Sequence, residues 1–253
     1  MGGASIAAGR RTRGAALALA ILAGCLAGRT APSHEPVPPG APQALFFGSS
    51  TVAGSGASAP HRRFTSLLAR QAGWREINEG LSGSTLTDVP GRVAPSGEAR
   101  WRAIASSGIR PAVVVVMYGA NDAVSGVPLG EANAPGTFRH AASTVLRGLR
   151  DAFPRAALVV CTPQPGHRLR HPRGPYDAAL AEEARAVGAI VLRGEEAFAG
   201  DALPRYAADT IHLNDAGHAA LAAHLGRALL DAGVIAEPHL AHAAFGTPPD
   251  LMP

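Results

Sequence analysis

Short runs of strand-forming residues alternate along the chain with longer segments in which apolar residues recur at helical spacing. The runs predict β-strands at residues 44–47, 75–78, 112–118, 157–162 and 189–192. The longer segments predict helices at residues 61–72, 98–107, 138–153, 176–187 and 215–232. Residues 113–117 are apolar at every position, which is typical of a strand covered by helices on both faces. The alternation predicts a single three-layer α/β/α domain around a five-stranded parallel sheet, with active residues at the carboxyl ends of the strands.

The first 24 residues have the three parts of an export signal. Three arginines precede an apolar stretch at residues 15–24, which ends in small residues and is preceded by no acidic residue. This stretch is too short to cross a bilayer, because a spanning helix needs about 20 apolar residues. Leu22-Ala23-Gly24-Cys25 resembles the bacterial lipobox, whose cysteine becomes the acylated first residue of a lipoprotein. We therefore expect lipid attachment at Cys25 and an exported cell-envelope protein, with simple secretion or a periplasmic location as the alternative.

The remaining chain divides by composition. Residues 25–42 contain five prolines and predict a semi-rigid tether. We expect the folded domain at residues 43–235 and a C-terminal extension, rich in Pro, Ala and His, at residues 236–253. Cys161, the other of the two cysteines, follows an apolar run and is expected to be a buried free thiol.

Composition and charge exclude several classes of protein. With 253 residues, 47% of them hydrophobic and 17% charged, the chain can bury the core of one ordinary domain, which excludes wholesale disorder. All 23 basic residues are arginines, and they outnumber the 19 acidic residues to give a net charge of +4. Without residues 1–24 the balance is 20 to 19, a net charge of +1. Such a weak surplus gives no field that would gather phosphates, so we expect no binding of nucleic acid.

Three polar segments fall at expected strand ends or just before the last helix. They are Gly48-Ser49-Ser50-Thr51, Gly119-Ala120-Asn121-Asp122 and Asp209-Thr210-Ile211-His212. Each alone is commonly structural: a Gly-Ser turn, an Asx turn and a surface Asp-His pair. Together they supply a serine nucleophile, an amide donor for an oxyanion, and an imidazole base beside a carboxylate that orients it. These are the groups that a serine enzyme needs to catalyse acyl transfer.

These segments resemble, in the same order, the sequence blocks of the SGNH hydrolases, the GDSL-type esterases and lipases. The matching blocks are residues 46–51, 78–85, 118–122 and 209–218. The resemblance covers most of residues 43–232 and implies the flavodoxin-like fold of that family. It implies Ser50 as the nucleophile and His212 as its base, with Asp209 as the partner of the imidazole. It also implies an oxyanion hole formed by the Ser50 N–H, the Gly83 N–H and the Asn121 side chain.

One position departs from the family pattern. The family's Gly-Asp-Ser is Gly-Ser-Ser here, so Ser49 stands in place of an acidic residue and is a minor rival to Ser50 as the nucleophile.

A different serine-hydrolase fold can be tested directly, because α/β-hydrolases carry their nucleophile in Gly-x-Ser-x-Gly. The sequence contains no such motif. We expect Asp122 to be a turn or capping residue and His218 to lie on a helix face, both outside catalysis.

The resemblance and the residues predict a carboxylic-ester hydrolase that needs no cofactor or metal and acts as a monomer. The expected substrates are small acyl or lysophospholipid esters, and the alternative is an O-acetyl ester of envelope or other polysaccharide. A catalytically silent envelope-binding protein is the alternative from another class, supported by Ser49 alone.

His167 and His171 have the spacing of metal ligands on a helix, but nearby prolines make a helix there improbable, and residues 164–175 predict a basic loop.

Overall fold

The structure is a computed structural model that describes residues 38–165, 173–198 and 203–236. Several expectations fall outside these residues and are not addressed by it. They concern the export signal, the lipobox with Cys25, the tether up to residue 37, the C-terminal extension beyond residue 236, and the pair His167 and His171.

The centre of the molecule is a parallel sheet of five strands. In chain order these are β1 (Gln43–Gly48), β2 (Arg75–Gly80), β3 (Pro111–Met117), β4 (Ala157–Thr162) and β5 (Ile190–Arg193). Their order across the sheet is β2-β1-β3-β4-β5, and every neighbouring pair is parallel. The predicted fold class is confirmed, and each expected strand is present within two residues of its predicted bounds.

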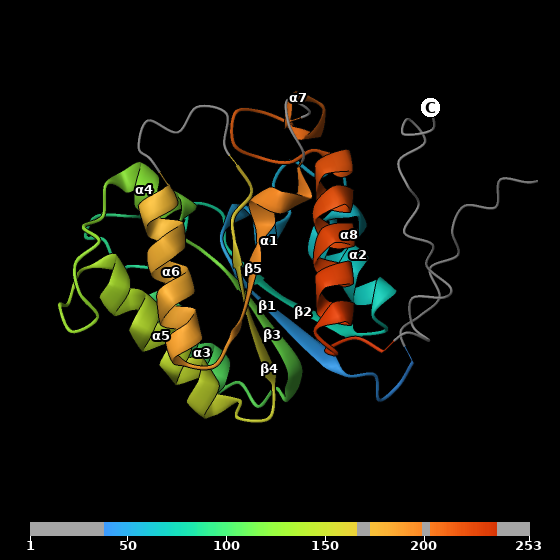
Figure 1. Ribbon diagram of the computed structural model, residues 1–253, viewed down its shortest axis with the longest axis horizontal. Helices are drawn as coiled ribbons and strands as arrows, with labels where there is room; N and C mark the ends of the chain where they lie inside the picture. The colour runs from blue at the N-terminus through green and yellow to red at the C-terminus, as the bar shows by residue number, and fades with distance from the viewer. Residues whose placement is uncertain (1–37, 166–172, 199–202, 237–253) are drawn as a thin grey trace, which may run out of the picture. The chain divides into compact units, whose positions relative to one another are not determined.

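Helices cover both faces of the sheet (Figure 1). One face carries α3 (Gly97–Ala105), α5 (Phe138–Ala152) and α6 (Gly174–Ala186), and the other carries α2 (Phe64–Gln71) and α8 (Asp215–Asp231). Local signals start two of them: the Ser96 hydroxyl accepts the Ala99 N–H at α3, and the Asn214 side chain accepts the Gly217 N–H at α8. Helices α3 and α8 therefore begin where the sequence supplies a capping side chain.

Strand β3 shows why its sequence is apolar throughout. Val114 and Val116 pack into the core beneath α3, α5 and α6, whereas Val113, Val115 and Met117 pack into the core beneath α2 and α8. All five side chains are at most 3% exposed. A strand with helices on both faces leaves no position for a polar side chain, which is the arrangement that the pattern predicts.

The short helices are the elements that the sequence pattern did not indicate. They are α1 (Ser50–Ala53), α4 (Ala120–Ser125), α7 (Leu203–Tyr206) and the 3₁₀ turns η1 (Pro60–Arg62) and η2 (Gly194–Ala197). The helix expected to begin at His61 was wrong at its start, because η1 occupies residues 60–62 and Arg63 is extended (φ −69°, ψ 150°). The helix itself begins at Phe64.

The strand order fixes where a site can form. The chain adds β2 on one side of β1 and then crosses to add β3 on the other side, so the direction of winding reverses at β1. Ligands of open parallel sheets bind outside the carboxyl ends of the strands at such a reversal. Gly48 and Met117, which pair at these ends of β1 and β3, directly precede the segments with Ser50 and Asn121.

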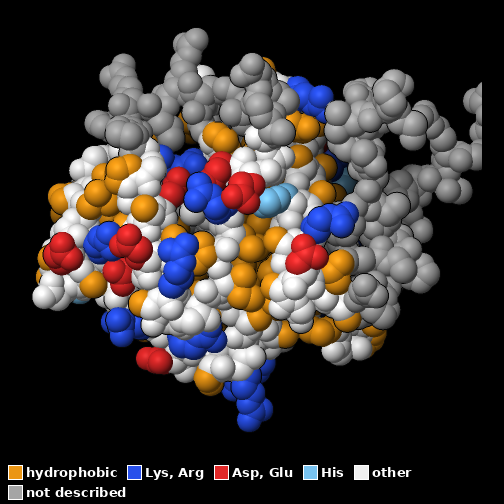
Figure 2. All heavy atoms as spheres, viewed as in Figure 1, with side chains coloured by type: hydrophobic (Ala, Val, Ile, Leu, Met, Phe, Trp, Pro, Cys, Tyr) orange, Lys and Arg blue, Asp and Glu red, His pale blue; other side chains and the backbone are white. Residues whose placement is uncertain are grey.

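On the face shown in Figure 2, arginine and acidic side chains are interspersed and form no patch of one sign. No helix among the described residues has the length and apolar character needed to cross a membrane.

Candidate active site

Ser50 lies at the turn between β1 and α1, where it is the first residue of the helix. Its carbonyl accepts the Gly54 N–H at 3.0 Å and the Ser55 N–H at 2.9 Å, so the turn is closed by backbone hydrogen bonds. Ser50 is half-buried, whereas Ser49 is only 7% exposed and its side chain makes no capping hydrogen bond to α1. Of the two serines, Ser50 is the more accessible.

The absence of side chains at two glycines lets α1 approach the ends of the strands. A methyl group on Gly80 would overlap the backbone of Val52 and Ala53, and one on Gly48 would overlap the Val52 side chain. Gly80 is the last residue of β2 and lies opposite Gly48. Helix α1 therefore sits directly on the carboxyl edge of β1 and β2, and Ser50 is fixed there with it.

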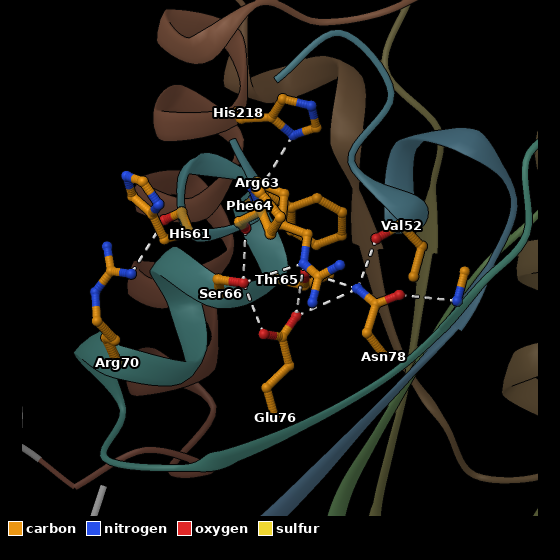
Figure 3. Close-up of polar contacts among 12 residues, drawn as sticks. Val52, His61, Arg63, Phe64, Thr65, Ser66, Arg70, Glu76, Asn78 and His218 are labelled. Carbon is orange, nitrogen blue, oxygen red and sulfur yellow. Dashed lines mark hydrogen bonds and ion pairs between the residues drawn. The ribbon is translucent and has the colours of Figure 1, made fainter. Parts of the chain in front are cut away.

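A polar cluster beneath α1 holds the helix in place (Figure 3). The Asn78 side chain, from β2, donates to the Val52 carbonyl of α1 at 2.7 Å and to the Thr65 hydroxyl of α2 at 3.0 Å. Its own carbonyl accepts the Gly80 N–H at 3.0 Å. Asn78 opens the second of the sequence blocks, and in the structure it ties the helix that carries Ser50 to the sheet and to α2.

Glu76 and Arg63 complete this cluster (Figure 3). The Arg63 Nε lies 3.1 Å from Glu76 Oε1, and the Ser66 hydroxyl donates to Glu76 Oε2 at 2.7 Å. Burial alone would raise the pKa of Glu76, but hydrogen bonds from Ser66 and Thr65 and the charge of Arg63 outweigh it and lower that pKa. The carboxylate therefore remains charged and holds β2 against α2.

Asp209 and His212 form a hydrogen-bonded pair in the loop before α8. The imidazole Nδ1 lies 2.7 Å from Asp209 Oδ2, while Asp209 Oδ1 accepts the backbone N–H groups of Ile211 and His212 at 2.8 and 2.7 Å. Burial would raise the pKa of Asp209, but the hydrogen bond with His212 and these two N–H donors lower it to about 2. The charged carboxylate thus accepts the Nδ1 hydrogen, which leaves Nε2 as the basic nitrogen.

The loop around this pair, residues 207–213, is called the histidine loop below. Ala207 and Leu213 form an isolated antiparallel bridge, and the Ala208 N–H donates to the His212 carbonyl at 2.9 Å. The loop then runs directly into α8 through Asn214, whose side chain also donates to the Arg205 carbonyl at 2.8 Å. The spacing of three residues between Asp209 and His212 is thereby closed into a fixed turn.

Asn121 and Asp122 start α4 and bind the segment that follows Gly83. The Asn121 amide donates to the Ser84 carbonyl at 2.8 Å. Asp122 is fully buried and accepts the N–H groups of Leu86 and Thr87 at 2.9 and 3.0 Å. Burial raises the pKa of Asp122, although these donors favour its charged form. The expected turn or capping role of Asp122 takes the form of contacts with the segment after Gly83, because its carboxylate accepts backbone N–H groups there.

Gly83 adopts a left-handed backbone conformation, with φ +78°, which favours glycine at this position. Its carbonyl accepts a hydrogen bond from Arg92 Nη2 at 2.6 Å. Together with the bond from Asn121 to the next residue, this contact fixes the Gly83 backbone beside α4.

Ser50, Asn121 and the histidine loop meet at one shallow depression, the Ser50 depression, of about 30 Å³. Its lining residues are Ser49, Ser50, Thr51, Ala120, Asn121, Val124, Gln164, Arg173 and Ile211. A smaller hollow beside it is lined by Asp209 and His212 and shares Ile211 with it. A larger cavity of about 640 Å³ lies between α8, α7 and η2 and shares none of the lining residues of the Ser50 depression.

The structure also adds residues that sequence reasoning missed. Gln164 and Thr51 line the Ser50 depression, and only their positions after a strand end could have indicated a role.

Cys161 is fully buried and free, as predicted, and burial raises the pKa of its thiol well above the ordinary value. Across residues 38–165, 173–198 and 203–236, no group of three or more His, Cys, Asp or Glu side chains is arranged to hold a metal ion.

The fold is that of a three-layer α/β/α protein, and its candidate site lies at the carboxyl ends of β1 and β3. The chain belongs to the GDSL-like lipase/acylhydrolase family, whose model matches residues 46–220. This match confirms the family that the four sequence blocks resemble.

Solved structures show the same fold. A protein from Lactobacillus plantarum is 25% identical, with a TM-score of 0.63 over 76% of this chain and 97% of its own. An inhibitor-bound aryl esterase from M. smegmatis is 20% identical, with a TM-score of 0.61 over 76% and 99%. A carbohydrate acetylesterase family member from Sinorhizobium meliloti is 16% identical, with a TM-score of 0.56 over 79% and 99%. A search of curated proteins gave no significant match.

Proposed function

We propose that the protein is a serine carboxylic-ester hydrolase in which Ser50 is the nucleophile and Asp209 and His212 complete the triad. The observation that carries this proposal is the Asp209–His212 pair at 2.7 Å, in a loop that shares the lining of the Ser50 depression. A hydroxyl is a weak nucleophile until an adjacent base takes its proton, and the base must itself be oriented by a third group. The charged Asp209 orients the imidazole so that Nε2 is the nitrogen available to Ser50.

The reaction then proceeds in two steps. His212 Nε2 takes the Ser50 proton while Ser50 Oγ attacks the ester carbonyl, and the same proton passes to the departing alcohol. Water, deprotonated by His212, next attacks the acyl carbon. The bond between the acyl carbon and Ser50 Oγ then breaks, His212 gives the proton to Oγ, and the acid is released. The oxyanion of each tetrahedral intermediate accepts hydrogen bonds from the N–H groups of Ser50 and Gly83 and from the Asn121 amide.

The shape of the site favours a short acyl group. Typical ligand pockets enclose roughly 300 to 1,000 Å³, whereas the Ser50 depression measures about 30 Å³. Val124 and Ile211 stand at its edge and are 51% and 42% exposed, so they offer apolar contact at the surface and not an enclosed channel for a long chain. We therefore propose esters of short acids as the substrates, in preference to lysophospholipids.

A second candidate is the removal of O-acetyl groups from a polysaccharide. The same observation favours it, because a shallow site holds a small acyl group and leaves the alcohol part of the ester outside, where it can be bulky. Hydrolysis rates across aryl esters of increasing chain length, measured beside acetylated sugars, distinguish the two. Rates that rise with acyl chains longer than butyrate would contradict both.

Covalent labelling tests the nucleophile. We expect Ser50→Ala to abolish ester hydrolysis and labelling by an organophosphonate, because no other hydroxyl would be activated by His212. Ser49→Ala, the matched control one residue earlier, should leave both largely unchanged. Labelling that persists in the Ser50 variant would disprove the assignment, and a wild type that is neither labelled nor active would favour the catalytically silent alternative.

We also propose that the enzyme is exported and anchored to a membrane by lipid on Cys25. The proposal is supported by the export-signal pattern of residues 1–24 and by Leu22-Ala23-Gly24-Cys25. Contact with the membrane would then be through the lipid alone, which places the esterase in the cell envelope.

A further inference from the structure

Gln164 is a buried amide that the proposed mechanism does not use. It stands two residues after the end of β4, between Pro163 and Pro165, and is 6% exposed. The guanidinium of Arg173 donates to the carbonyls of both Pro163 and Gln164, which fixes the backbone on which the amide is mounted. A buried amide is costly unless its donors and acceptor are paired, so its partners indicate what it holds together.

The partners of the Gln164 side chain come from two distant parts of the chain. Its Nε2 donates to the Thr51 hydroxyl at 2.9 Å and to the Ile211 carbonyl at 3.0 Å, and the Thr51 hydroxyl lies 3.1 Å from its Oε1. Thr51 follows Ser50 in α1, and Ile211 precedes His212. One side chain therefore bridges the residue next to the nucleophile and the residue next to the base.

The other hydrogen bonds of the histidine loop are local, while its last residue, Leu213, is buried in the core beneath α2 and α8. The other hydrogen bonds recorded for residues 207–213 in the described part of the chain join them to residues 204–214. Those bonds set the shape of the loop, but none of them reaches α1. The bond from Gln164 to the Ile211 carbonyl spans this gap.

The distance between loop and helix matters because proton transfer needs Ser50 Oγ and His212 Nε2 within about 3 Å of each other. A displacement of about 1 Å costs roughly a hundredfold in rate. On the basis of the proposed function, we infer that Gln164 is a positioning residue that sets the distance between Ser50 and His212 by binding both segments. It touches no reacting atom and acts through Thr51 and Ile211.

Gln164→Met tests this role, because methionine keeps the length of the side chain and removes both donors. We expect kcat to fall about tenfold to a hundredfold, with KM changed by no more than about twofold. The thermal unfolding midpoint should fall as well, because the Thr51 hydroxyl and the Ile211 carbonyl lose this partner. The rate of organophosphonate labelling of Ser50 should fall in parallel, since it depends on the same base. Gln71→Met, the same substitution on α2, is the matched control and should leave kcat unchanged.

Two further variants keep the test decisive if Gln164→Met folds poorly. Gln164→Glu keeps the side-chain shape and an acceptor for the Thr51 hydroxyl but loses the donor to Ile211, so kcat should still fall. Thr51→Val removes the other contact, and its effect combined with Gln164→Met should be smaller than the product of the two separate effects, because the residues share one bridge.

The outcomes separate this inference from the proposed function. A wild type that is active and labelled at Ser50 establishes the function, and the variants then test Gln164 alone. Unchanged kcat in both Gln164 variants would overturn the positioning role. A loss of activity that only matches a loss of folded protein, measured by active-site titration, would overturn it as well. A wild type that neither hydrolyses esters nor labels would remove the function and the inference together.

Discussion

In the proposed mechanism, Asn121 performs two tasks with one amide group. One N–H is committed to the Ser84 carbonyl at 2.8 Å, which holds the segment after Gly83 close to α4. An amide nitrogen carries two hydrogens, so the second is available to a developing oxyanion. The next residue, Asp122, binds Leu86 and Thr87 of the same segment. The side chains of Asn121 and Asp122 thus hold the loop that carries Gly83, and Asn121 also lines the Ser50 depression.

Asn121→Ala should lower kcat by about a hundredfold or more, which is the usual loss when one oxyanion donor is removed. KM should change much less, because the lost hydrogen bond forms chiefly in the transition state. Steady-state kinetics on a short-chain aryl ester provide the measurement, with Asn133→Ala in an exposed loop as the control. A loss of less than about tenfold would reduce Asn121 to a turn residue that holds Ser84.

Residue types were easier to predict than residue partners. Ser50, Asn121, Asp209 and His212 could be selected because each follows a strand or precedes a helix with chemistry suited to acyl transfer. The local pattern placed Asp122 and Gln164 near strand ends but did not indicate their hydrogen-bond partners, which lie 36 and 113 residues away. Such contacts depend on which strands become neighbours, and a single sequence does not reveal that order.

At the scale of elements, burial on two faces made the strands predictable. β4 has the predicted bounds, because each of its residues is apolar or small and packs between helices. α1 and α4 escaped prediction because four and six residues are too few to display a helical period. These two helices carry Ser50 and Asn121, so the elements nearest the proposed chemistry were those that periodicity reveals least.

The contact between α2 and α8 contains a buried histidine. His218 stacks on the Phe64 ring, with centroids 6.3 Å apart and planes at 6°, and its Nδ1 accepts the Phe64 N–H at 3.2 Å (Figure 3). Its Nε2 lies 3.3 Å from the Ser55 carbonyl and therefore donates. One nitrogen accepts and the other donates, which requires the neutral imidazole. Burial lowers the pKa of His218 below its ordinary value of 6.5, although the Ser55 carbonyl and the charge of Asp215 oppose the shift.

This lowered pKa predicts how stability depends on pH. Above pH 6.5 the histidine is neutral in the folded and the unfolded chain, and the contact contributes fully. As the pH falls below 6.5, the unfolded chain binds the proton first, so the free energy of unfolding decreases until the folded pKa is reached. Urea unfolding midpoints between pH 7 and pH 5 should show this decrease, and His218→Gln should reduce its slope.

His140→Gln on α5 is the matched control and should keep the wild-type slope. Because acidic side chains also contribute to acid destabilisation, the informative quantity is the difference in slope between the two variants and the wild type. Equal slopes in wild type and His218→Gln would show that His218 is not the source.

At the scale of the whole molecule, the four sequence blocks and the family match lie within the described domain. The match covers residues 46–220, and the sheet begins at Gln43, so each residue of the proposed site is supplied downstream of residue 37. The two parts of the chain can therefore be tested separately: one for chemistry and the other for location.

Lipid on Cys25 predicts where the protein is found. A single acyl chain binds membranes only marginally, whereas two or more hold a protein firmly, and lipoprotein processing at a lipobox cysteine supplies at least two. The wild type should therefore sediment with membranes and need detergent for release.

Cys25→Ser should incorporate no radiolabelled fatty acid, while Cys161→Ser, the matched control at the buried thiol, should incorporate it as the wild type does. A chain without residues 1–37 should stay in the soluble fraction and keep its ester hydrolysis, because the site lies wholly downstream. Wild-type protein that is soluble and carries no fatty acid would instead indicate ordinary secretion, with cleavage elsewhere in the alanine-rich stretch before Cys25.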